Sequence, residues 1–156
     1  MTNRYEIEIR SIQSSDYEKW LALWQGYQTF YKANILPEVT RTTWERMLNQ
    51  NEPVYGALAI VGGEIIGMVH WIFHRSCWTT GDYCYLQDLF VASDRRKQGV
   101  GKSLIEHVYS IAEQAGCSRV YWLTHESNSE AIRLYDGVAE RSGFIQYRKN
   151  FPAIKK

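Results

Sequence analysis

A basic, glycine-rich segment after an apolar stretch holds the residue types best suited to binding a ligand. Residues 89–92 are the apolar stretch Leu-Phe-Val-Ala. Gly99 and Gly101 lie further along the chain, where an amphipathic run begins at Val100. A strand, a loop and a helix in this order direct backbone N–H groups and the positive end of the helix dipole toward one spot. The segment therefore predicts a site for a phosphorylated ligand. Four side chains add positive charge there: Arg95, Arg96, Lys97 and Lys102.

Two common phosphate-binding loops are excluded by residue identity. A P-loop that ends at Gly101-Lys102-Ser103 needs its first glycine at position 96, which is Arg96. A dinucleotide-binding fingerprint needs a third glycine at position 104, which is Leu104. The remaining pattern is Arg/Gln-x-x-Gly-x-Gly/Ala at the start of a helix, and residues 96–101 fit it.

The pattern of strands and helices supplies the scaffold for this loop. Alternation predicts a strand at 5–10, and Ser14, Ser15 or Asp16 can cap the helix that follows. A second helix is expected to open at Pro37, and a hairpin of 54–61 and 65–73 to turn at Gly62-Gly63. A strand at 83–91 should follow, and then a helix that begins at Val100 and is stopped by Gly116. The last elements are a strand at 119–124, a helix begun by Ser127 and Glu130, which have capping-box spacing, and a closing strand at 144–151. This β-α-α-β-β-β-α-β-α-β order predicts an α/β fold with a mixed sheet and helices on its faces.

The loop and this order resemble the GNAT acetyltransferases, whose acetyl-CoA loop has the pattern of residues 96–101. A second family signature is similar to residues 128–135 followed by Gly143-Phe144. Residues 87–91 and 121–128 are similar to the Hpa-type subgroup, which includes histone, polyamine and D-amino-acid acetyltransferases. The resemblance implies a GNAT fold whose central strands, 83–91 and 119–124, splay apart. Residues 136–142 make the spacing between Tyr135 and Gly143-Phe144 longer than is common in the family.

The resemblance also implies how acetyl-CoA is bound. The pyrophosphate would meet backbone N–H groups of residues 98–102, and the pantetheine arm would pair with the main chain of residues 89–91. Arg96 and Lys97 would lie near phosphates or hold the loop, while Asn128 would bond the pantetheine arm or cap its helix. The residues in these roles are Leu89, Phe90, Val91, Arg96, Lys97, Gln98, Gly99, Val100, Gly101, Lys102 and Asn128.

Amine attack on a thioester needs a base for the amine and a proton for the departing thiolate. Tyr135 matches the family tyrosine that protonates the thiolate. Asp88 and Glu126 lie near the ends of the strands that should splay, and either can serve as the base, directly or through water. His70, His74 and His125 are further candidates, whereas direct transfer leaves no covalent role for Cys84. Strand alternation puts Asp88 and Phe90 on one face and Leu89 on the other.

Aromatic residues are candidates for contacting a cationic acceptor, because aromatic rings attract cations. Such residues also pack in cores, and the sequence leaves both readings open. The set expected at the acceptor site is Trp24, Tyr27, Tyr31 and Tyr83, with Trp44 and Trp78 as further candidates.

Bulk properties limit the remaining classes of function. The chain of 156 residues suits one domain, 1–156, and its formal net charge of +1 argues against a nucleic-acid partner. It has no long apolar run and no signal-like start, and its three cysteines lack metal-ligand spacing. We therefore expect a cytoplasmic protein with no membrane partner and no metal.

The predicted function is transfer of an acetyl group from acetyl-CoA to a primary amine of a small molecule, such as a polyamine or an amino acid. The alternatives are a histone-type lysine acetyltransferase and a non-catalytic acyl-CoA-binding sensor. A homodimer is expected by resemblance, with the apolar residues 144–147 and Phe151 at its interface.

Overall fold

The computed structural model describes residues 5–153 of the chain. These residues form two compact units, which meet between Leu123 and Thr124 in the sequence and are described separately. The first unit holds the sheet and three α-helices. The second holds one α-helix and the segment that follows it.

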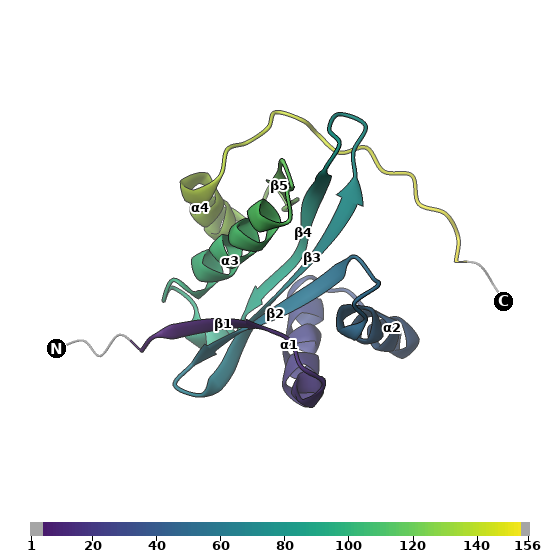
Figure 1. Cartoon of the computed structure of the whole chain (residues 1–156). Helices are drawn as coiled ribbons and strands as arrows, with labels where there is room; N and C mark the ends of the chain where they lie inside the picture. The colour runs from purple at the N-terminus through teal and green to yellow at the C-terminus, as the bar shows by residue number, and fades with distance from the viewer. Residues whose placement is uncertain (1–4, 154–156) are drawn as a thin grey trace. The chain divides into compact units, whose positions relative to one another are not determined.

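The first unit is built on a five-stranded sheet in the order β1-β2-β3-β4-β5 (Figure 1). The neighbours from β1 to β4 are antiparallel, and β5 is parallel to β4. The strands are β1 (Ile7–Ser11), β2 (Val54–Val61), β3 (Glu64–Arg75), β4 (Asp82–Val91) and β5 (Val120–Tyr121). Gly62 and Gly63 both have positive φ and form the predicted β2–β3 turn.

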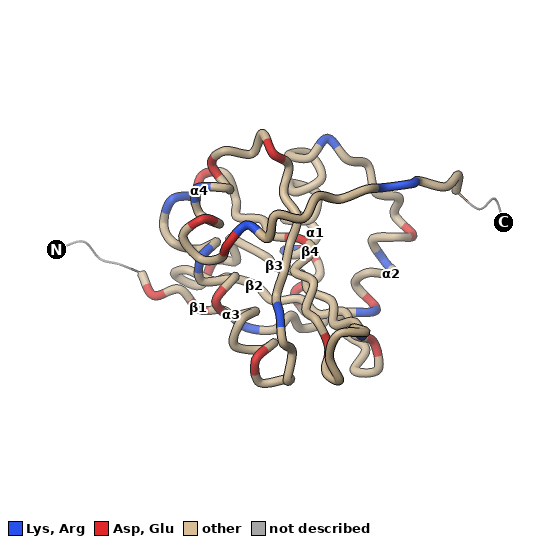
Figure 2. Tube along the Cα trace, turned by 90° about the horizontal axis from the view of Figure 1, so that it is seen from above, with Lys and Arg blue, Asp and Glu red and all other residues tan. Residues whose placement is uncertain are grey.

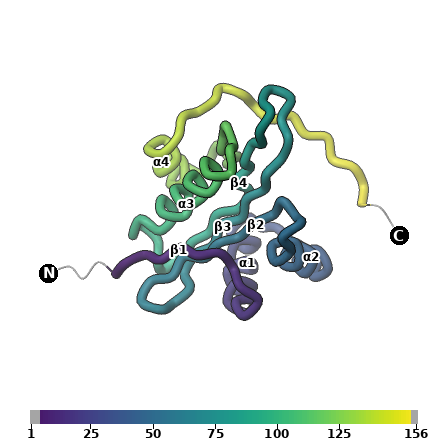
Figure 3. Tube along the Cα trace, in the orientation of Figure 1, coloured from purple at the N-terminus to yellow at the C-terminus, as the bar shows by residue number. Residues whose placement is uncertain are grey.

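Helices cover both faces of this sheet, which makes three layers (Figures 1 and 3). One face carries α1 (Tyr17–Phe30) and α2 (Pro37–Leu48), and the other carries α3 (Val100–Gln114). Two short 3₁₀ helices, η1 (Ser14–Asp16) and η2 (Ser93–Arg95), precede α1 and α3. Pro37 opens α2 as predicted, and Gly116 follows the end of α3 in a left-handed conformation.

Each layer buries the apolar positions that the sequence periodicity indicates. Between the sheet and the first two helices lies a cluster made of Ile12, Trp20, Leu23, Trp24, Trp44, Met47, Leu58 and Met68. On the opposite face, α3 buries the stripe Val100, Leu104, Ile105, Val108 and Ala112. The amphipathic helix after the glycine loop is therefore confirmed.

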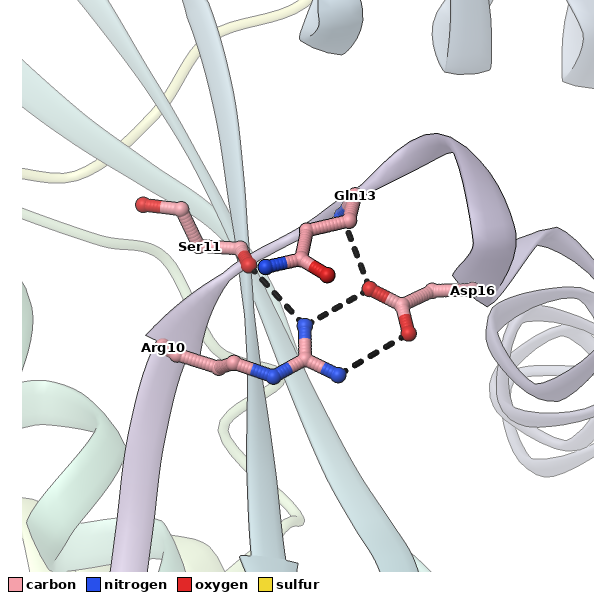
Figure 4. Close-up of polar contacts among 4 residues, drawn as sticks. All are labelled: Arg10, Ser11, Gln13 and Asp16. Atoms are coloured by element: carbon pink, nitrogen blue, oxygen red, sulfur yellow. Dashed lines mark hydrogen bonds and ion pairs between the residues drawn. The ribbon is translucent and has the colours of Figure 1, made fainter.

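An ion pair fixes the connection from β1 to α1 (Figure 4). The guanidinium of Arg10 donates to both carboxylate oxygens of Asp16 at 2.7 and 3.0 Å, and the Gln13 N–H donates to the same carboxylate at 2.8 Å. The Arg10 hydrogen bonds hold the pKa of Asp16 below its ordinary value. Asp16 was one predicted cap for α1, but its side chain makes no capping bond to that helix.

Three predicted features of the C-terminal third differ from the structure. Strand 119–124 shortens to Val120–Tyr121, and residues 144–151 form no strand. A strand needs backbone bonds to a neighbour, which an apolar pattern alone does not supply. The last helix, α4, spans Ser129–Val138, and Asn128 rather than Ser127 occupies its N-cap.

Charge is mixed along the chain. Acidic and basic residues are interspersed along the trace (Figure 2), in keeping with the formal net charge of +1. Among the described residues, none of the helices has the length and apolar character needed to cross a bilayer.

Candidate active site

The N-terminus of α3 offers unbonded backbone donors to an anion. Gly99 is the N-cap, has a φ of 83° and makes no side-chain capping bond. The first bond of the helix runs from the Ser103 N–H to the Gly99 carbonyl at 3.0 Å. The N–H groups of Val100, Gly101 and Lys102 therefore have no acceptor within the helix. The first turn of α3 carries no acidic residue, so its positive dipole end is not offset locally.

The space around Gly99 suits a ligand that approaches the backbone closely. A Cβ added at Gly99 would meet no heavy atom within 4 Å. Lys97 also has a positive φ of 64°, which a side-chain-bearing residue adopts rarely. The Lys102 ammonium lies 3.8 Å from Glu106 on the exposed surface of the helix. This cradle of open backbone fits the phosphate groups of a nucleotide-like ligand.

Arg96 holds the loop against the end of β4. Its Nε donates to the Val91 carbonyl at 3.1 Å. Its guanidinium lies over the rings of Phe30 and Phe90, at 5.1 and 5.5 Å from their centroids. These contacts tie the Arg96 side chain to the end of β4.

The edge of β4 next to β5 is open over the residues predicted to bind pantetheine. Leu89, Phe90 and Val91 pair with β3 on one side. On the other side, β5 pairs only with Cys84 and Tyr85 among the described residues. The main chain from Leu86 to Val91 thus has an edge without a strand neighbour in the described sheet. An extended polar arm can add to such an edge as a further strand does.

A β-bulge at Gln87 sets the direction of the Asp88 side chain. Leu86 is opposite Trp71 and Asp88 is opposite His70, so Gln87 is an extra residue with no partner in β3. Trp71 contacts His107 of α3, whereas His70 contacts Trp20 of α1. Asp88 consequently faces the α1 side of the sheet.

A chain of buried hydrogen bonds ends at the Asp88 carboxylate. The indole Nε1 of Trp20 donates to His70 Nε2 at 2.9 Å, and His70 Nδ1 lies 2.9 Å from Asp88 Oδ2. The Tyr27 phenol is also near Asp88, whose negative charge adds to the rise in the pKa of that phenol. Asp88 keeps 9% of its surface exposed, against 3% for His70 and 0% for Trp20. The carboxylate is therefore the most accessible end of the chain.

Two tyrosines lie beside this carboxylate, Tyr27 on α1 and Tyr31 directly after its end. Burial raises the pKa of Tyr27 strongly, and the negative charge of Asp88 adds to that rise. The pKa of Tyr31 is raised by burial and by Asp88, while Arg96 opposes the change. The Tyr27 ring contacts those of Tyr31 and Phe90, with centroid distances of 4.7 and 6.4 Å. Both phenols hold their protons at neutral pH, so Tyr27 can donate to Asp88.

The other two aromatic residues predicted for the acceptor site, Trp24 and Tyr83, do not lie beside the carboxylate in the same way. Trp24 is 5% exposed, belongs to the core cluster and donates to Thr40 at 3.1 Å. Tyr83 lies at the start of β4, where its ring contacts His74 and lies under the Arg119 guanidinium, 4.4 Å away. The structure brings Tyr27 and Tyr31 together near Asp88 and places Tyr83 at the far end of β4. Trp24 is a buried residue behind them, with its ring 5.2 Å from that of Tyr27 and 5.1 Å from that of His70 between centroids.

The second unit contains the remaining predicted site residues. Tyr135 lies on α4, and Glu126 lies in the turn before it. Asn128 makes no capping bond, and its Nδ2 lies 3.5 Å from Thr124 Oγ1. The Ser127 hydroxyl lies 2.6 Å from His125 Nδ1 rather than capping α4. Asn128 thus occupies the N-cap of α4 without a capping bond from its side chain, and the capping box predicted for Ser127 is wrong.

Sequence reasoning missed Trp20 as part of the site. His70 had been one of several histidine candidates, with no means of choosing among them. Trp20 and His70 are 50 residues apart in the chain, and only the packing of α1 on β3 joins them. The sequence around Trp20 shows only a tryptophan one helical turn before Trp24. That spacing predicts core packing as well as it predicts a site residue.

A donor-lined helix start beside an open strand edge, with a carboxylate nearby, defines an acyl-CoA-dependent acyltransferase. A family profile described as "Acetyltransferase (GNAT) family" matches residues 10–138. The chain belongs to this family and is an N-acetyltransferase. GNAT acetyltransferases use acetyl-CoA, and the open backbone at Gly99 fits that cosubstrate.

Comparison with known proteins gives related N-acetyltransferases of small molecules. The chain is 38% identical over 146 residues to the D-amino-acid N-acetyltransferase HPA3 of Saccharomyces cerevisiae, covering 92% of this chain and 91% of that one. It is 30% identical over 112 residues to a thialysine N-epsilon-acetyltransferase of Caenorhabditis elegans, covering 69% of each.

Solved structures confirm the fold. A ribosomal-protein-alanine N-acetyltransferase from Brucella melitensis biovar Abortus 2308 gives a TM-score of 0.79 at 20% identity, covering 94% of this chain and all of that one. The aminoglycoside N-acetyltransferase AAC(6')-Iy, solved in complex with CoA, also gives 0.79 at 20% identity, covering 97% and 99%. The GNAT fold predicted from the sequence is therefore confirmed.

Proposed function

We propose that this enzyme acetylates the primary amine of an amino acid or a similar small molecule, with Asp88 as its base. The observation that carries the proposal is the Asp88 carboxylate, which faces α1 beside Tyr27 and Tyr31 and keeps some exposure to solvent. A carboxylate next to aromatic rings attracts an ammonium group by charge and by cation–π interaction. The names of the relatives, a D-amino-acid and a thialysine acetyltransferase, support a small amino-acid acceptor.

The reaction is direct transfer from thioester to amine. An alkyl ammonium has a pKa near 10.4, so Asp88, directly or through a water molecule, takes a proton to expose the nitrogen lone pair. The nitrogen attacks the thioester carbonyl carbon, the C–S bond breaks, and the nitrogen loses a second proton to solvent as the amide forms. Tyr135 gives its proton to the departing thiolate. Glu126 is the other candidate for the base.

No enzyme nucleophile enters this scheme. Burial raises the pKa of the Cys84 thiol to about 12, so Cys84 remains protonated at neutral pH. A protonated thiol is a poor nucleophile. Direct transfer is the route that the surroundings of Cys84 support.

The open backbone described above supports the proposed mode of acetyl-CoA binding. The N–H groups of residues 98–102 receive the pyrophosphate, and the open edge at residues 89–91 pairs with the pantetheine arm. Lys97 adds positive charge near the phosphates, and Asn128 bonds the arm.

We also propose that the enzyme is a cytoplasmic homodimer with no nucleic-acid or membrane partner. Phe144, Ile145, Tyr147 and Phe151 are exposed apolar side chains of the kind that associate with a partner. Cys77, Cys84 and Cys117 are unpaired within the described residues, as in a reducing compartment. Light scattering at micromolar concentration tests the dimer, and a monomer would contradict it.

The function is tested by measuring thiol release from acetyl-CoA with a panel of amines. The panel holds D- and L-amino acids, a thialysine-like amine, polyamines, aminoglycosides and a histone-tail peptide, with CoA binding measured in parallel. Saturable turnover with an amino acid is expected. Turnover with the peptide alone would establish a protein acetyltransferase instead, and CoA binding without any turnover would favour a sensor.

A further inference from the structure

We propose that Trp20 locks His70 in one tautomer, and that His70 in this form is the positioning residue for the Asp88 carboxylate. The proposal rests on the proposed function, because it assigns His70 and Trp20 a role only through Asp88. Neither residue touches the acceptor in this scheme. The argument starts from the donor and acceptor capacity of three side chains.

Trp20 decides which nitrogen of His70 carries the proton. An indole N–H is only a donor, so the 2.9 Å contact requires a lone pair on His70 Nε2. A neutral imidazole with a bare Nε2 carries its hydrogen on Nδ1. His70 Nδ1 therefore donates to Asp88 Oδ2 across their 2.9 Å separation. In a doubly protonated ring, His70 Nε2 would also carry a hydrogen. It would then face the Trp20 N–H with no lone pair to accept that donor.

This arrangement orients Asp88 without cancelling its charge. A neutral imidazole supplies a hydrogen bond but no positive charge, so the carboxylate keeps its attraction for an ammonium group. A carboxylate has about four lone-pair positions, and His70 occupies one of them. The remaining lone pairs can accept a hydrogen bond from the substrate amine or from a bridging water.

Other groups around Asp88 fit this assignment. The neutral phenols of Tyr27 on α1 and Tyr31 directly after its end approach Asp88, and Tyr85 lies nearby on β4. The guanidinium of Arg96 is engaged with Phe30, Phe90 and the Val91 carbonyl. The residues that α2 buries, Thr40, Trp44 and Met47, carry no charge.

The packing of Trp20 makes the lock rigid. Its side chain is fully buried, and its ring lies 4.9 Å from that of Trp44 and 6.0 Å from that of Trp24 between centroids. The indole N–H cannot turn to another acceptor without breaking these contacts. His70, fully surrounded as well, has the same constraint.

The first test is the ¹⁵N NMR spectrum of the histidine rings in the full chain at neutral pH, which does not depend on activity. The expected pattern for His70, assigned by its loss in His70→Asn, is a protonated Nδ1 and an unprotonated Nε2. Trp20→Phe removes the donor but keeps an aromatic ring, so we expect the pattern to change to a mixture of tautomers or a doubly protonated ring. Trp24→Phe is the matched control, because the Trp24 ring also packs against His70, at 5.1 Å between centroids, but its N–H donates to Thr40. The His70 pattern should therefore stay as it was.

An Nε2-protonated or doubly protonated His70 in the unaltered protein would overturn the tautomer assignment. A Trp20→Phe spectrum unchanged from the unaltered one would overturn the role of Trp20, because Asp88 alone would then hold the tautomer. These outcomes hold whether or not any amine is acetylated. Absence of turnover with every amine would count against the proposed function alone and leave the tautomer result standing.

The second test separates positioning from structural support by comparing two substitutions of His70. The amide nitrogen of Asn can lie near the position of Nδ1 and donate to Asp88, whereas His70→Phe fills the space without a donor. Losing a hydrogen bond to a charged group corresponds to a change of about tenfold or more. We expect His70→Phe to lower kcat at least about tenfold, with KM for acetyl-CoA unchanged, and His70→Asn to recover most of that loss. Equal kcat values in two folded variants would overturn the positioning role.

Discussion

Leu86 and Asp88 are two positions apart on β4 but point to opposite faces of the sheet. In a regular strand such residues share a face, and the extra residue Gln87 between them reverses this relationship. Leu86 is opposite Trp71, on the α3 side, and Asp88 is opposite His70, on the α1 side. The bulge therefore turns a carboxylate toward the aromatic residues of α1, in the strand that also offers an open edge.

Replacing Asp88 by Asn should reduce turnover without weakening the binding of acetyl-CoA. An amide has almost the shape of a carboxylate but neither accepts a proton nor attracts an ammonium group by charge. General-base contributions are typically about 10²–10⁴-fold, so we expect kcat to fall about 100-fold or more. Steady-state kinetics with the best amine of the panel, together with calorimetry of CoA binding, measures both effects.

Asp82→Asn is the matched control for this variant. Asp82 lies on the same strand and pairs at 3.2 Å with Arg75, whose side chain is 90% exposed. Exposed ion pairs contribute little, so this variant should keep its turnover. Full activity of the Asp88 variant would remove Asp88 from the mechanism and leave Glu126 as the remaining carboxylate candidate.

Placing a side chain at Gly99 should abolish acetyl-CoA binding. Gly99→Glu puts a carboxylate beside the backbone donors of α3, where it repels phosphate and fills the open space. Gly63 has a similar φ, 79° against 83°, and open space around its Cβ position as well. Gly63→Glu therefore carries the same backbone cost, roughly 1–2 kcal/mol, but lies in the β2–β3 turn. Calorimetric titration with CoA should show binding lost for the Gly99 variant alone, and similar losses in both would contradict the loop assignment.

Local patterns predicted the elements that local physics determines. A few neighbouring residues are enough to predict each of three features: the apolar stripe of α3, the start of α2 at Pro37 and the glycine turn after β2. The loop at Gly99 was also predictable, because the need for positive φ and close approach selects glycine.

Features set by distant contacts were not predictable from such patterns. The bulge at Gln87 carries no glycine or proline that would signal it, and its position emerges from the pairing of β3 with β4. Trp24 and Tyr27 lie at neighbouring turns of α1, yet the former is core and the latter reaches Asp88. Aromatic type alone does not separate these two surroundings. The segment 144–151 shows the same limit, since a β-rich composition did not make a strand.

Replacing Tyr135 by Phe should separate chemistry from binding in the second unit. The variant keeps the ring on α4 but lacks the hydroxyl proton proposed for the thiolate. We expect kcat to fall about tenfold or more, within the range for loss of a general acid, while the affinity for CoA changes little. The control is Tyr5→Phe, which alters a tyrosine that is 66% exposed ahead of β1. Turnover equal to that of the control would show that the thiolate leaves without help from Tyr135.

The ion pair between Arg10 and Asp16 should make stability depend on pH in a defined direction. The pKa of Asp16 is lowered in the folded state, chiefly by the Arg10 hydrogen bonds. The unfolded chain therefore binds the proton more readily, and the stabilisation is present above the ordinary value of 3.8. It is lost as the pH falls through the lower, folded-state pKa. Asp16→Asn should accordingly lower the free energy of unfolding at pH 7, by about 1.5–3 kcal/mol for hydrogen bonds to a charged group.

Urea unfolding from pH 7 to pH 3 measures this dependence. The difference between Asp16→Asn and the unaltered chain should be constant near neutral pH and shrink once the pH drops below about 4, near the ordinary Asp value. The Asp82 variant, whose ion pair lies at an exposed arginine, should differ from the unaltered chain by at most about 1 kcal/mol throughout. A gap for Asp16→Asn that stays the same down to pH 3 would mean that the carboxylate contributes shape rather than charge, and that Arg10 does not hold the β1–α1 connection through its guanidinium.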